Sequence, residues 1–73
     1  MNPIKRKQME ERVQELETEI AELETAIAEH ETSLLTFVSA EETERLSREL
    51  KDRQADHQKR LAEWEALSEA LQA

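Results

Sequence analysis

The chain of 73 residues has no cysteine and no glycine, and it contains one proline, one tryptophan and one phenylalanine. The absence of cysteine excludes disulfides, thiolate zinc sites and cysteine nucleophiles. The absence of glycine excludes phosphate-binding loops of the Walker and Rossmann types. A composition with 38% charged and 3% aromatic residues is typical of a long helix or coiled coil.

Long apolar runs are missing as well. No segment approaches the ~20 apolar residues of a membrane-spanning helix, and the first residues lack the apolar core of a signal peptide. We therefore expect a cytoplasmic protein with no membrane contact. Its length allows at most one small domain.

The most prominent pattern in the sequence is a pair of stripes of mainly apolar residues, one in each half of the chain. Their steps of three and four residues keep one face of a helix against a partner helix. We call these positions the seam: Met9, Val13, Leu16, Ile20, Leu23, Ile27 and Leu34 in the first half, and Leu46, Leu50, His57, Leu61, Trp64, Leu67 and Leu71 in the second. A helix cannot bury such a stripe alone, so each half predicts the other as its partner.

Capping residues set the expected boundaries. Asn2 followed by Pro3 is typical of a helix start, and Ser39 with Glu42 three residues later forms a capping box. We expect a linker end and helix entry at 1–8, a first helix at 9–35, a connection at 36–39 and a second helix at 40–72. Because a short connection makes neighbouring helices antiparallel, the sequence predicts an all-α, two-helix antiparallel coiled-coil hairpin that is monomeric. The alternative is one long helix that pairs with a second chain.

Folding the chain back on itself predicts a register in which facing residue numbers add to about 77. The facing seam positions are then Val13 and Trp64, Ile20 and His57, and Ile27 and Leu50. The expected ion pairs between the helices are Glu24 with Arg53 and Glu17 with Arg60. At the open end Trp64 is expected to pack on Met9 and Val13, with its indole N–H reaching the surface.

The connection and the histidines each allow two interpretations. Phe37 and Val38 are expected to fold over the end of the seam near Leu34 and Leu46; the alternative is an exposed apolar tip that contacts a partner. His30 and His57 lie roughly 15 Å apart along the rod in this register, so we expect polar interruptions that fix pairing rather than a shared metal site. The carboxylates lie along an exposed rod without a cavity, which predicts a non-catalytic chain with no metal.

Charge is unevenly distributed around a formal net charge of −8. Residues 10–31 hold nine glutamates and one arginine, whereas residues 45–60 hold six cations and three acids. The candidate nucleic-acid contacts are Lys5, Arg6, Lys7, Arg45, Arg48, Lys51 and Lys59. The alternative is that these cations are solvated partners of nearby acids on the same helix.

Three motifs resemble the C-terminal coiled-coil domain of the ABC-F ATPases, in particular Uup-like members: Asn2-Pro3-Ile4-Lys5, Val13-Gln14-Glu15-Leu16-Glu17 and Ala62-Glu63-Trp64-Glu65-Ala66-Leu67. The resemblance implies two ATP-binding cassettes before this chain, with ATP and Mg bound by that parent and no cofactor here. It also implies contact with ribosomal RNA or DNA and, through the parent, action on the ribosome. A structural coiled coil that binds another polypeptide, without nucleic acid, is the alternative function.

Overall fold

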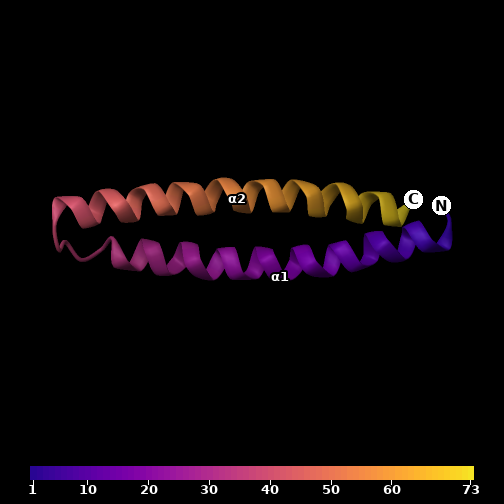
Figure 1. Cartoon of the computed structure of the whole chain (residues 1–73), viewed down its shortest axis with the longest axis horizontal. Coiled ribbons are helices and arrows are strands. Elements are labelled where there is room, and N and C mark those ends of the chain that lie inside the picture. Colours follow the sequence, from indigo (N-terminus) through magenta and orange to yellow (C-terminus); the bar gives the residue numbers. More distant parts are fainter.

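The computed structural model describes all 73 residues and contains two helices, α1 (Pro3–Ser33) and α2 (Ala40–Gln72). They run antiparallel side by side and form a rod of 55 × 15 × 14 Å (Figure 1). Both termini lie at one end, which we call the open end, and the connection lies at the other. This arrangement confirms the predicted all-α helical hairpin. Neither helix carries an apolar stretch of the length that a membrane crossing requires.

Both helices begin at the predicted caps. The Asn2 side chain accepts a hydrogen bond from the Lys5 backbone N–H at 2.7 Å, and Pro3 is the first helical residue. Residues 3–8 therefore already belong to α1. The Ser39 hydroxyl accepts from the Glu42 N–H at 3.0 Å, whereas the Glu42 carboxylate binds Arg45. Only the serine half of the capping box is therefore formed.

The connection closes without glycine and without a residue of positive φ. α1 ends at Ser33. Two backbone hydrogen bonds between residues three apart follow, from Leu35 N–H to the Thr32 carbonyl at 3.1 Å and from Thr36 N–H to the Ser33 carbonyl at 3.3 Å. These bonds tighten the last turn into a 3₁₀-like geometry. The chain then reaches Ser39 in an extended conformation, so the connection comprises residues 34–39.

The seam is narrow. Leu16 is the one fully buried residue of the chain, with 0% exposure. All other seam positions, His57 included, are half-buried, and so is His30. Two helices bury one stripe each and leave the flanks in water, because a chain this short cannot enclose a core from all sides.

Cross-helix hydrogen bonds define the register: Arg6 to the Leu71 carbonyl, Arg12 to Glu63, Glu19 to Arg60, Glu24 to His57 and His30 to Glu49. Within each pair the two residue numbers add to between 75 and 81, and this range includes the predicted sum of about 77. The two expected ion pairs are wrong, however. Glu24 bonds His57 rather than Arg53, and Arg60 bonds Glu19 rather than Glu17, because Arg60 faces the opposite edge of the α1 stripe.

Two expectations about apolar side chains are also wrong. Phe37 and Val38 do not cover the seam end; they are 74% and 73% exposed, as the alternative of an exposed tip requires. On the connection, the half-buried residues are Leu34 and the cap Ser39. The Trp64 indole nitrogen does not reach the surface, since it is buried without a hydrogen-bond partner.

Replacing Leu16 by Ala tests the dependence on this seam. Removing a fully buried leucine costs about 2–5 kcal/mol, which is comparable to the ~3–5 kcal/mol available to a domain of this size. We expect L16A to be largely unfolded at 25 °C by circular dichroism. The matched control is L35A, because Leu35 is 86% exposed and its loss should leave the melting curve unchanged. Equal melting of L16A and wild type would contradict this account of the core.

Trp64 provides a second test. An unpaired buried donor costs about 1–3 kcal/mol, so W64F, which keeps a ring and removes the N–H, should melt at or above the wild-type temperature. W64A should melt well below it because the ring is lost. A W64F melting point as low as that of W64A would mean that the indole N–H is needed.

Candidate functional site

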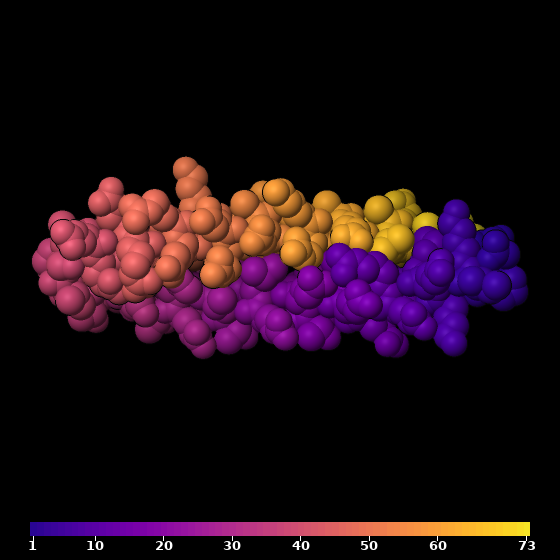
Figure 2. Space-filling model, viewed as in Figure 1, coloured from indigo at the N-terminus to yellow at the C-terminus, as the bar shows by residue number.

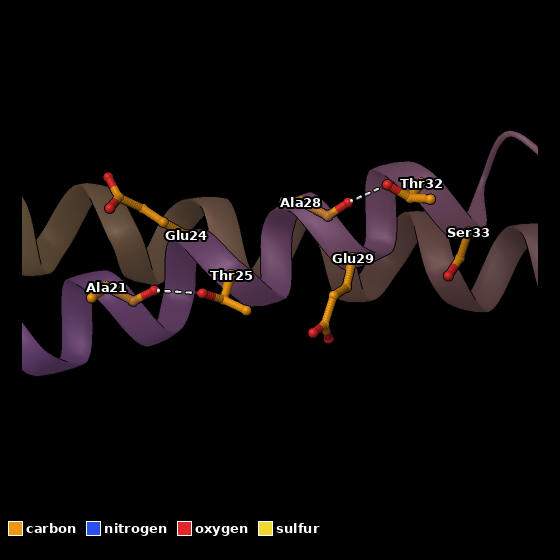
Figure 3. Close-up of a pocket in the computed structure, with 7 residues that line it drawn as sticks. All are labelled: Ala21, Glu24, Thr25, Ala28, Glu29, Thr32 and Ser33. Carbon is orange, nitrogen blue, oxygen red and sulfur yellow. Dashed lines mark hydrogen bonds between the residues drawn. The ribbon is translucent and has the colours of Figure 1, made fainter.

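The largest hollow of the molecule lies on the outer face of α1 (Figure 3). It has a volume of about 910 Å³ and is lined by Ala21, Glu24, Thr25, Ala28, Glu29, Thr32 and Ser33. The Thr25 and Thr32 hydroxyls donate to carbonyls of their own helix, at 3.1 and 2.9 Å. Ligand sites converge polar groups from several elements, whereas this hollow is the surface of a single helix. No group of three His, Asp or Glu side chains is arranged to hold a metal ion.

An ion cluster joins the helices toward the open end. The Arg12 guanidinium holds both oxygens of Glu63, at 2.8 and 3.0 Å. It also contacts Glu15 at 3.1 Å and Glu19 at 3.0 Å, and Glu19 in turn accepts from Arg60 at 3.2 Å. The hydrogen bond from Arg12 lowers the pKa of Glu63. The planar, two-pronged geometry fixes how the helices sit beside one another.

A second cluster joins the helices near the connection. His30 places Nδ1 2.7 Å from the Ala26 carbonyl and Nε2 2.8 Å from Glu49. Because both partners are acceptors, the doubly protonated imidazolium satisfies both bonds. The other Glu49 oxygen accepts from Arg45 at 2.8 Å, and Arg45 also binds Glu42, whose N–H is held by Ser39. The network thus runs from the seam to the N-cap of α2.

The His30 pair shifts two pKa values in opposite directions. The hydrogen bond to Glu49, followed by the bond to the Ala26 carbonyl, raises the pKa of His30 above its ordinary 6.5, while desolvation and, to a smaller extent, Arg53 oppose the shift. The same hydrogen bond lowers the pKa of Glu49. The pair therefore stabilises the hairpin between the ordinary carboxyl and imidazole pKa values, and its contribution is lost as the pH rises through the raised pKa of His30.

All seven candidate nucleic-acid contacts are exposed, but the structure does not gather them. Lys5, Arg6 and Lys7 lie at the open end, whereas the four others are spread along α2. The three arginines among the seven candidates each contact carboxylates of their own helix. Arg6 binds Glu10 at 3.6 Å, Arg48 binds Glu44 at 3.7 Å, and Arg45 binds Glu42 and Glu49. None of the four lysines has a carboxylate within 4.0 Å.

Sequence reasoning missed several groups that the structure brings together. The Arg12–Glu63 and His30–Glu49 bonds were not expected, because the predicted register places these residues near one another without deciding which edge residues meet. Leu35 was also missed as an exposed apolar residue. The available signal was its position directly after Leu34, one step off the seam stripe.

NMR titration of the imidazoles tests the second cluster. In the wild type we expect a His30 pKa above 6.5, and in E49Q a lower one because the charged acceptor is gone. The stability lost in E49Q should be larger at pH 5.5 than at a pH above the raised pKa of His30, where the imidazole is neutral in both proteins. A His30 pKa that is the same in both proteins would show that the pair does not form.

We compared the chain with known protein families, proteins and structures. No protein-family model, no curated protein and no solved structure matches the chain. Membership of the ABC-F ATPases therefore stays a prediction that rests on the motifs at Asn2 to Lys5, Val13 to Glu17 and Ala62 to Leu67.

Proposed function

We propose that this hairpin is the non-catalytic arm of an ABC-F ATP-binding protein and extends from the ATPase body toward a macromolecular partner. The observation that carries the proposal is the position of the termini. Both lie at the open end of a 55 Å rod (Figure 1). A body attached through either terminus leaves the connection free at the far end. The sequence motifs of the ABC-F C-terminal domain point to the same arrangement.

The two ion clusters support a mechanical role. Arg12–Glu63 ties the helices toward the open end and His30–Glu49 ties them near the connection. Figure 2 shows the helices lying against each other along the rod. A movement of the body at the open end is then passed to the connection by a rod that moves as one unit. In this proposal ATP and Mg are bound by the cassettes of the parent, and this chain only transmits the motion.

The proposed nucleic-acid contact, with ribosomal RNA or DNA, comprises the basic residues at the start of α1 and the outer face of α2. Lys5 and Lys7 support it, because their ammonium groups are exposed and carry no carboxylate partner. On α2, Lys51 and Lys59 share these properties. Arg45 is a weaker candidate, since two carboxylates already occupy its guanidinium. Action on the ribosome would place the protein in the cytoplasm.

The second candidate is a structural coiled coil that binds a polypeptide and no nucleic acid. The net charge of −8 favours it, because phosphate attraction requires a positive surface. The exposed apolar side chains at the connection favour it as well.

Titration of duplex DNA and of a ribosomal RNA hairpin, followed by fluorescence anisotropy between about 20 and 200 mM salt, separates the two functions. For the arm we expect affinity to fall steeply with salt. The variant K5Q/R6Q/K7Q should bind at least about tenfold more weakly, and its salt slope should fall by about 2 to 3.

The comparison variant is R48Q/K51Q/K59Q, which also removes three positive charges but lies on α2, so the two losses compare the two halves of the proposed contact. An unchanged affinity of K5Q/R6Q/K7Q would move the contact to α2. Absence of binding to either nucleic acid at the lowest salt would reject this contact and favour the polypeptide-binding function.

A further inference from the structure

A group of exposed apolar residues lies on the connection, at the end of the hairpin opposite the open end. Leu35, Phe37 and Val38 are 86%, 74% and 73% exposed, and we call these three residues the apolar tip. They are consecutive but for Thr36, so their side chains crowd the outside of one short connection. Apolar surface concentrated in this way is typical of an interaction site.

The fold does not need these side chains. Leu34 ends the seam and is half-buried, and Ser39 caps α2 through its hydroxyl. The turn itself is closed by backbone bonds from Leu35 and Thr36, which any non-proline residue makes. Polar residues at 35, 37 and 38 would satisfy the same backbone and would avoid the exposure of leucine, phenylalanine and valine to water.

The surroundings of the apolar tip are acidic. The sequence has no lysine or arginine between Arg12 and Arg45. Glu31 and Glu41, within about one helical turn of the tip on either side, are exposed and have no cation within 4.0 Å. The nearest arginine, Arg45, is held by Glu42 and Glu49. The tip therefore combines an apolar centre with free negative charge at its border.

We propose that the apolar tip docks against an apolar surface of a partner protein that is bordered by lysine and arginine. The apolar centre requires an apolar surface to cover it, and the free carboxylates of Glu31 and Glu41 require cations around it. The same charges disfavour nucleic acid, anionic lipid and a second copy of this tip, all of which bring further negative charge. The docking goes beyond the proposed nucleic-acid contact, which uses the cations of α1 and α2 and not the apolar tip.

The test uses the whole chain labelled with ¹⁵N and, as probe, a synthetic amphipathic helix with leucine on one face and lysine along its borders. Its counterpart carries glutamate in place of lysine. We expect the lysine probe to shift amide resonances in residues 29–44 and the glutamate probe to shift none. The variant F37S/V38S should weaken binding by about tenfold or more, because two apolar side chains no longer leave water.

Two further variants separate the parts of the tip. E31Q/E41Q should weaken binding of the lysine probe by a smaller factor and make it less sensitive to salt. I4S is the matched control, since Ile4 is 75% exposed at the open end, and its affinity should equal that of the wild type. All these substitutions lie on exposed side chains, and unchanged helical circular dichroism verifies the fold.

Several results would overturn the proposal. One is binding of both probes alike, and another is a set of shifts spread along α1 that survives in F37S/V38S. Tip shifts caused by duplex DNA, or by vesicles of phosphatidylcholine with phosphatidylglycerol, would assign a different occupant. Sedimentation above the 8.5 kDa of a single chain that disappears in F37S/V38S would assign the tip to a second copy.

Discussion

The contact between two narrow apolar stripes is the interaction on which the rest of this structure depends. Only Leu16 is removed from water entirely, and every other seam side chain keeps one flank exposed. Hydrophobic stabilisation grows with the apolar area buried, so a two-helix rod has little of it in reserve. The fold must then be specified by features that do not require a deep core: long regular helices, well-formed caps at Asn2 and Ser39, and polar contacts along the edges of the seam.

Those polar contacts are concentrated at two places along the rod, Arg12–Glu63 and His30–Glu49, which we call the two ties. Arg12 joins α1 to α2 toward the open end, and His30 joins them near the connection. Exposed ion pairs add little to stability, so their main consequence is register. A slide of either helix by one heptad would preserve an apolar stripe but would separate Arg12 from Glu63. The seam thus supplies attraction, and the two ties select one alignment from those that the seam allows.

The sequence predicts the parts of this fold that depend on periodicity and on local chemistry. Steps of three and four identify both stripes, Asn2 and Ser39 identify the helix starts, and the register follows to within a few residues. Which edge residues meet does not follow, because Glu17 and Glu19 both flank the stripe of α1 and only the rotation of each helix decides between them. Whether the Phe37 side chain is buried or exposed is also not predicted, since a connection without glycine does not indicate its backbone conformation. At the candidate contacts, the sequence identifies exposed cations with acids at helical spacing from them, but which carboxylates bind Arg45 follows only from side-chain geometry.

These constraints explain why the ends of the rod are the places to look for function. Along its length, each seam position is committed to holding the helices together, and the edge residues that are not seam supply the ties. Substitution there changes the fold before it changes a partner contact. The apolar tip is different, because backbone bonds close the connection without its side chains, and Leu35 is the most exposed of the large apolar residues in the chain. Exposed leucine, phenylalanine and valine lower solubility and return no stability to the hairpin. A partner that covers them is the physical explanation that accounts for both their chemistry and their position.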